Sequence, residues 1–141
     1  MTPIAAYDLG RVPYREALEL QPDSPEAHWA MAVFLRLAAS ESASALSILQ
    51  RGLELAPDNV NLLRNLGLAR RALGRVKEAL APMRRAEQLD PRNFLNKVAL
   101  SGTLLRLHLS KEAREVADRG LEMVPGNYDL VLYKMLSFLQ E

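Results

Sequence analysis

The stretch LELAPDN at residues 53–59 decides the fold, because close variants of it recur along the chain. The variants are LELQPDS at 18–24, AEQLDPRN at 86–93 and LEMVPGN at 121–127. Their prolines are spaced 35, 34 and 34 residues apart, at Pro22, Pro57, Pro91 and Pro125. A fixed period in the range of roughly 20–50 residues is the sequence signature of a repeat protein.

Each variant marks the end of one helix and the start of the next. A proline ends an amphipathic helix, and a Ser or Asn two residues later can cap the following one. The predicted caps are Ser24, Asn59, Asn93 and Asn127. A second break falls near the middle of each unit, at 40–44, 74–75 and 108–110. Every unit is therefore predicted to be two helices of about a dozen residues joined by a short turn.

The composition also predicts an all-α protein. Leu and Ala contribute 27 and 19 of the 141 residues, whereas Val, Ile and Thr together contribute only 12. Because β-branched residues are favoured in strands, this composition argues against a sheet of several strands. Apolar residues make up 49% of the chain, which is too many for a disordered protein.

This period and pattern resemble the tetratricopeptide repeat, a helix–turn–helix unit of about 34 residues. The best match is residues 60–91, where large and small residues alternate in the family's order. The matching positions are Leu63, Leu66, Gly67, Ala79, Met83, Ala86 and Pro91. The resemblance implies a right-handed α-solenoid of antiparallel helix pairs, in which small residues allow close helix packing. Lys97 departs from the pattern, since the family has a large apolar side chain there.

The resemblance treats residues 1–141 as a single domain with three full repeats and two half-repeats. The full repeats are 25–57, 60–91 and 94–125. The half-repeats are a lone second helix at 10–22 and a C-terminal capping helix at 128–140.

The resemblance further implies a concave groove lined mainly by the first helix of each pair. Its floor would be apolar and edged by arginines, with further residues from the last helix at Leu132, Tyr133 and Leu136. The predicted peptide-binding residues are Trp29, Val33, Arg36, Arg64, Asn65, Leu68, Arg71, Val98, Leu105 and Arg106. Such a surface suits a peptide or helix with apolar anchors and carboxylates, because the planar guanidinium matches a carboxylate. Trp29, the chain's single Trp, could instead pack against an adjacent helix at 7–21.

One branch of the family clamps the acidic C-terminal tails of heat-shock chaperones with Lys, Asn and Arg side chains. That pattern matches this chain at little beyond Asn65. Leu95 and Ala99 stand where the clamp needs cations. The sequence therefore argues against a co-chaperone of that kind.

Nothing in the sequence predicts a catalytic residue, a metal site or a cofactor, so we predict a protein that is not an enzyme. Cysteine is absent, which excludes disulfides and thiolate chemistry. We expect His28 in the core and His108 in a turn, 80 residues away. The acidic residues from Glu112 to Glu122 alternate with Lys and Arg, as on an ordinary solvated helix face.

The net charge of +1 is unevenly distributed. Residues 60–92 carry eight basic and three acidic side chains. A basic band can contact nucleic acid, but Lys77, Arg84 and Arg85 fall on a second helix, which faces outward in this family. No aromatic residues interleave with them, so we predict a solvated face and no nucleic-acid partner.

The expected partner is another protein, held by an adaptor or scaffold in its groove. The visible start has no secretory signal, and no apolar run is long enough to span a bilayer. These observations predict a soluble protein and favour the cytoplasm. Two alternatives remain open: a scaffold that self-assembles through its complementary terminal half-repeats, and the docking domain of a larger enzyme.

Overall fold

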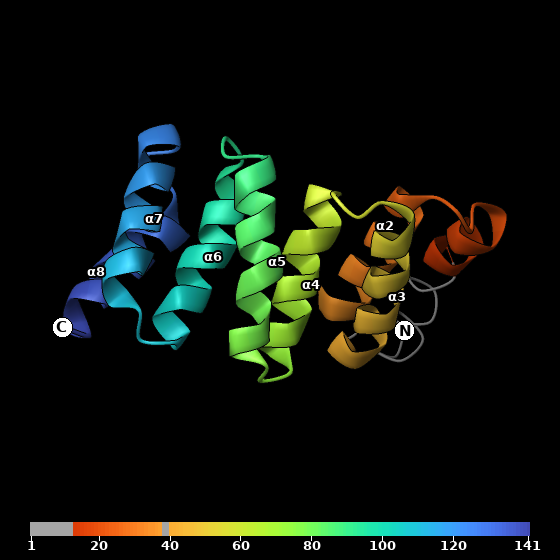
Figure 1. Cartoon of the computed structure of the whole chain (residues 1–141), viewed down its shortest axis with the longest axis horizontal. Coiled ribbons are helices and arrows are strands. Elements are labelled where there is room, and N and C mark those ends of the chain that lie inside the picture. The colour runs from red at the N-terminus through yellow and green to blue at the C-terminus, as the bar shows by residue number, and fades with distance from the viewer. Residues whose placement is uncertain (1–12, 38–39) are drawn as a thin grey trace, which may run out of the picture.

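The computed structural model describes residues 13–37 and 40–141, and every regular element within these ranges is a helix. A helical segment over residues 13–20 lies at one end of a row of helices, and α7 and α8 lie at the other (Figure 1). The helices between and including these ends are α2 (Pro25–Leu37), α3 (Ser42–Leu55), α4 (Val60–Ala72), α5 (Val76–Leu89), α6 (Phe94–Arg106), α7 (Ser110–Met123) and α8 (Tyr128–Leu139). The first residues of the predicted helix at 10–22 lie outside the described ranges.

Consecutive helices pack as antiparallel pairs, α2 with α3, α4 with α5, and α6 with α7. The first helices of successive pairs also contact one another, from α2 to α4, α4 to α6 and α6 to α8. This arrangement is an α-solenoid, and it confirms the predicted fold class. One side of the row is therefore formed by α2, α4, α6 and α8.

The four predicted helix caps are confirmed. In each case the side-chain oxygen accepts a hydrogen bond from a backbone N–H in the first turn, which satisfies one of the unpaired donors there. The caps Ser24, Asn59, Asn93 and Asn127 accept from the N–H groups of Ala27, Leu62, Leu95 and Leu130 at 3.2, 3.1, 3.1 and 3.0 Å.

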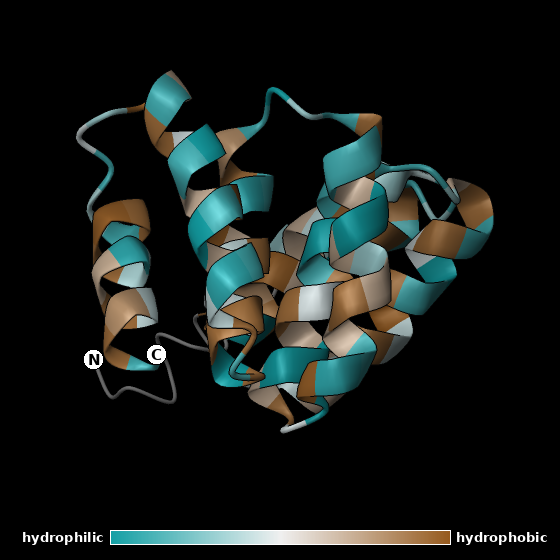
Figure 2. Cartoon of the chain, turned by 60° about the vertical axis from the view of Figure 1, so that its left-hand side comes forward, coloured by the Kyte–Doolittle hydropathy of each residue, from teal (hydrophilic) through white to brown (hydrophobic). Residues whose placement is uncertain are grey.

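The core is divided between successive pairs. One buried cluster joins α2, α3 and α4, and another joins α5, α6 and α7. Gly67 shows why small residues are needed at the predicted positions: a Cβ there would lie 2.6 Å from Cγ of Met83 and 3.0 Å from the carbonyl oxygen of Ala79. Figure 2 shows hydrophobic and hydrophilic residues mixed along each helix, as expected for helices with one buried and one exposed side.

Lys97 stands where the family pattern has a large apolar side chain, and it forms a buried ion pair there. Its side chain is 3% exposed, and its Nζ lies 2.8 Å from Oε1 of Glu87, which is 14% exposed. The same ammonium donates to the carbonyl oxygen of Pro91. The departure from the family pattern is thus accommodated by a salt bridge between α6 and α5.

Candidate functional site

A cavity of about 260 Å³ lies on the side of the row formed by α2, α4 and α6. We call it the central hollow. Within each helix its lining residues are one, three or four positions apart, so each helix presents one face to it. The lining residues are Trp29, Val33, Arg36, Arg64, Asn65, Leu68, Arg71, Leu95, Val98 and Ala99. The structure thus brings eight of the ten predicted groove residues together in one place.

The other two predicted residues, Leu105 and Arg106, lie further along α6 in a second cavity of about 440 Å³. We call this the distal hollow; Tyr133 and Leu136 of α8 also line it, whereas Leu132 lines neither hollow. Tyr133 packs over Gly102, where a Cβ would lie 2.9 Å from Cζ of the tyrosine ring. Val98, Ala99, Gly102 and Leu105 follow one face of α6, so the two hollows lie along the same face of that helix.

Arg64 is more deeply buried than its predicted position at the edge of the groove. Only 7% of the residue is exposed. Its Nη1 donates to Oδ1 of Asn96 at 3.0 Å, and its Nη2 donates to Oδ1 of Asn61 at 2.9 Å. These amides can hold the guanidinium inside because they accept the hydrogen bonds that water would otherwise accept.

Arg36 and Arg71 are held in the same way. Nη2 of Arg36 donates to Oδ1 of Asn65 at 3.3 Å, and Nη1 of Arg71 donates to Oγ1 of Thr103 at 3.2 Å. The acceptors of Arg36, Arg64 and Arg71 lie 29, 32 and 32 residues further along the chain. Sequence reasoning missed Asn96 and Thr103 as partners. One signal in the sequence could have indicated these hydrogen bonds: each arginine is followed, slightly less than one repeat further on, by a polar residue that can accept one.

Burial lowers the pKa of Arg36, Arg64 and Arg71 below the ordinary arginine value. Repulsion between the guanidinium groups adds to this effect. Arg36 lowers the pKa of Arg64, while Arg106 and Arg36 lower that of Arg71; Asp90 and Tyr133 oppose these shifts in turn. The groove therefore concentrates desolvated positive charge.

None of these three arginines forms an ion pair within the described part of the chain. Two arginines on α5 are paired instead: Arg84 with Glu112 at 2.8 Å and Arg85 with Asp58 at 3.0 Å. Both pairs are solvent-exposed, as the sequence analysis expected of this basic band. In the central hollow, neutral amide and hydroxyl oxygens thus take the place of carboxylate partners.

Two further donors in the groove lack acceptors. Nε1 of Trp29 and Nε of Arg36 are buried, and neither has a hydrogen-bond partner among the described residues. The Trp29 side chain lines the central hollow and also packs against the core cluster of α2, α3 and α4. The structure therefore places Trp29 at once in the groove and against the core.

Replacing Arg71 with Met is expected to raise the free energy of unfolding by about 1 kcal/mol, because an uncompensated, partly buried charge is removed at similar volume. The pKa of Arg71 is lower in the folded state than in the unfolded state. The cost of burying the charged guanidinium therefore lowers stability at every pH at which Arg71 is protonated, and it would disappear only at very high pH. Urea unfolding at neutral pH measures the change. A loss of stability would show that the hydrogen bonds to Thr103 outweigh the desolvation cost.

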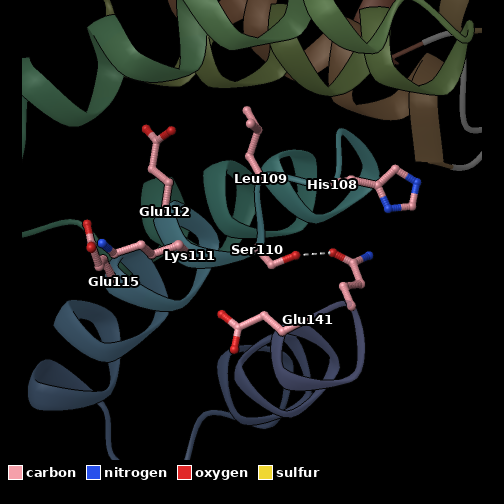
Figure 3. Close-up of a pocket in the computed structure, with 8 residues that line it drawn as sticks. His108, Leu109, Ser110, Lys111, Glu112, Glu115 and Glu141 are labelled. Carbon is pink, nitrogen blue, oxygen red and sulfur yellow. Dashed lines mark hydrogen bonds between the residues drawn. The ribbon is translucent and has the colours of Figure 1, made fainter.

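A third cavity, of about 580 Å³, lies at the end of the row between the start of α7 and the C-terminus (Figure 3). Ser110 and Gln140 form a hydrogen bond of 2.7 Å between Oγ and Oε1. His108 lies on one side of the cavity and Glu112 on the other, so the histidine and this carboxylate do not converge. Among the described residues, no group of three His, Asp or Glu side chains could hold a metal ion.

A family model described as the tetratricopeptide repeat matches residues 35–94. Residues 35–94 match the tetratricopeptide repeat, and the described chain has the fold of tetratricopeptide repeat proteins. The family prediction made from the repeated stretches is thereby confirmed. No curated protein matches the chain in sequence.

Solved structures share this fold at low sequence identity. MamA has a TM-score of 0.82 at 15% identity, with 96% of this chain and 74% of MamA covered. A thermophilic tetratricopeptide repeat protein of Thermus thermophilus has a TM-score of 0.77 at 20% identity, covering 99% of this chain and 82% of that one. The TPR2B domain of yeast Sti1, in complex with pHsp70, has a TM-score of 0.76 at 16% identity, covering 83% and 98%.

Tetratricopeptide repeat proteins are generally non-catalytic modules for protein–protein interaction, and the fold of this chain is of that kind. Within residues 13–37 and 40–141, no helix is long and apolar enough to cross a membrane.

Proposed function

We propose that this protein is a non-catalytic adaptor that binds an acidic, partly apolar peptide segment of a partner protein in its groove. The observation that carries the proposal is the cluster of Arg36, Arg64 and Arg71 around the central hollow, none of which forms a salt bridge within the described chain. A carboxylate of the ligand would supply the missing counter-charge. Charge-assisted hydrogen bonds of this kind are about twice as strong as neutral ones.

The apolar part of the groove favours a ligand that also carries hydrophobic side chains. Val33, Leu68 and Val98 line the central hollow together with the ring of Trp29. Leu105, Tyr133 and Leu136 continue this surface into the distal hollow. Buried apolar anchors of this kind commonly supply most of the affinity for a bound peptide or helix.

The proposed ligand is not purely acidic, because a purely acidic ligand would need basic side chains along the whole groove. The similar domain of yeast Sti1 is in complex with pHsp70, but that likeness extends only to the fold. In this chain Leu95 and Ala99 line the central hollow together with the arginines. We therefore infer a mixed ligand, in which apolar side chains contact α6 and carboxylates contact the arginines.

Fluorescence of Trp29 tests the proposal directly, since it is the only tryptophan and lines the hollow. The protein is titrated with a synthetic peptide of mixed Leu and Glu, and with the same peptide in which Gln replaces Glu. We expect a saturable change in emission with the Glu peptide, at least tenfold tighter than with the Gln peptide. Equal affinities for the two peptides, or no change with either, would contradict the proposal.

A further inference from the structure

Two arginines of α4, Arg64 and Arg71, are tied to α6 by equivalent hydrogen bonds. Nη1 of Arg64 donates to Oδ1 of Asn96 at 3.0 Å, and Nη1 of Arg71 donates to Oγ1 of Thr103 at 3.2 Å. The two arginines are seven residues apart on α4, and their two acceptors are seven residues apart on α6. Because an α-helix rises about 1.5 Å per residue, both ends of the second bond are shifted by about 10 Å relative to the first. The two guanidinium groups are therefore held about 10 Å apart.

The two acceptors are themselves fixed by the packing of α6. Asn96 and Thr103 are both fully buried. Nδ2 of Asn96 donates to two backbone carbonyl oxygens at the end of α5, at 3.1 and 3.2 Å, which leaves its Oδ1 facing Arg64. Oγ1 of Thr103 donates to the carbonyl oxygen of Ala99 at 2.8 Å. The spacing of the two arginines is therefore set by buried groups of the fold.

Each of these arginines has a second guanidinium near it. Arg36 donates to Asn65, the residue next to Arg64, at 3.3 Å. After burial, repulsion from Arg36 is the largest cause that lowers the pKa of Arg64, and repulsion from Arg106 is the largest that lowers the pKa of Arg71. We call Arg36 and Arg64 the Arg64 centre, and Arg71 and Arg106 the Arg71 centre. None of these four arginines forms an ion pair within the described chain.

The surface between the two centres is apolar. Leu68 lies between Arg64 and Arg71 on α4 and lines the central hollow. Val98 and Ala99 lie in the corresponding stretch of α6 and line the same hollow. A charged group placed against these side chains would lose hydration without gaining a partner. The groove thus presents positive charge, then apolar surface, then positive charge along α4 and α6.

We propose that the ligand carries two carboxylates on separate residues, about 10 Å apart and joined by an apolar stretch, and that each carboxylate binds one of the two centres. This inference rests on the proposed function and specifies the ligand of the same groove. Once the first carboxylate is bound, the second meets its centre at a high effective concentration, provided that the spacing matches. The distance between the centres therefore selects among acidic ligands.

Peptides with a stiff polyproline spacer test this spacing on the full chain. Each peptide has blocked termini, a Leu at either end, and two Glu residues separated by two or by five Pro residues. Because polyproline II has about three residues per turn and rises about 3.1 Å per residue, the two Glu residues share one face, at about 9 or about 19 Å. The fluorescence of Trp29, which lines the central hollow, reports binding.

We expect the two-Pro peptide to bind at least tenfold tighter than the same peptide with one Glu replaced by Gln, because its second carboxylate reaches the second centre. In the five-Pro peptide, the second Glu is expected to improve affinity less than about threefold, because the spacer exceeds the distance between the centres.

Variants assign the effect of the second Glu to the Arg71 centre. Arg71→Gln is expected to reduce the tenfold gain in the two-Pro peptide to less than about threefold. Arg84→Gln is the matched control and is expected to keep the gain, since Arg84 pairs with Glu112 and does not line the groove. Circular dichroism checks that each variant is folded. If Arg71→Gln unfolds the protein, Arg106→Gln provides the same test on an exposed side chain.

Equal gains from the second Glu in the two-Pro and five-Pro peptides would overturn the inference, and so would a gain that persists undiminished in Arg71→Gln. If one Glu strengthens binding and the second adds nothing at either spacing, the groove binds a single carboxylate; this inference then fails while the proposed function stands. If no Glu strengthens binding, both fail together.

Discussion

Arg64→Glu combined with Arg71→Glu is expected to weaken binding of an acidic, apolar peptide by at least about 30-fold. Removing one side of a desolvated charge pair typically costs 2–5 kcal/mol, and about 1.4 kcal/mol corresponds to tenfold in affinity. Both guanidinium groups lie in the central hollow, where burial lowers their pKa. A carboxylate of the ligand would meet two negative charges in place of two positive ones.

The matched control is Arg84→Glu combined with Arg85→Glu, which changes the net charge by the same amount. These two arginines lie on α5, pair with Glu112 and Asp58, and do not line the hollow. The control is expected to bind within a factor of about three of wild type, since exposed pairs contribute little. Equal losses in the two double variants would show that only overall charge matters. Because Arg64 is buried, Arg71→Gln alone serves as the milder variant if the first one unfolds.

Lys97→Ala is expected to lower the free energy of unfolding by about 3 kcal/mol. The change leaves the carboxylate of Glu87 without its ammonium partner, and removing one member of a buried ion pair commonly costs 3–5 kcal/mol. One oxygen of Glu87, Oε2, is buried and has no hydrogen-bond partner in the described chain even with Lys97 present. The loss is therefore not easily compensated by another group. Urea unfolding followed by circular dichroism measures it.

Removing both charges separates the ion pair from the packing of the lysine stem. Lys97→Met combined with Glu87→Gln is expected to recover most of the stability, because apolar or neutral replacement of a buried pair is often close to neutral. If Lys97→Ala alone lowers the free energy of unfolding by less than about 1 kcal/mol, water reaches Glu87 and the ion pair contributes little to stability. Circular dichroism in the absence of urea confirms that each variant starts from the folded state.

The fold was predictable because its signals are local. The regular spacing of Pro57 and the equivalent prolines predicted the repeat length. Asn59 and the equivalent capping residues predicted where the helices begin. The groove residues were implied by the resemblance to the tetratricopeptide repeat, which places one face of each first helix in the groove. Eight of the ten predicted residues consequently lie in one cavity.

What the sequence did not predict depends on contacts between helices. The burial of Arg64 requires the amide of Asn96 on the next first helix, 32 residues away, at 3.0 Å. Lys97 breaks the family pattern in sequence, and only its distance to Glu87 shows how the position is accommodated.

Site-specific photo-crosslinking with the partner tests most directly the claim that the groove binds an acidic, apolar peptide. A photoreactive phenylalanine analogue replaces Leu68 in the central hollow, and Ala81, exposed on α5, is the control position. The account predicts crosslinks at Leu68 to a partner segment that contains Asp or Glu beside apolar residues, lost when Arg71 is changed to Glu. Crosslinks confined to position 81, or a captured segment without acidic residues, would contradict it.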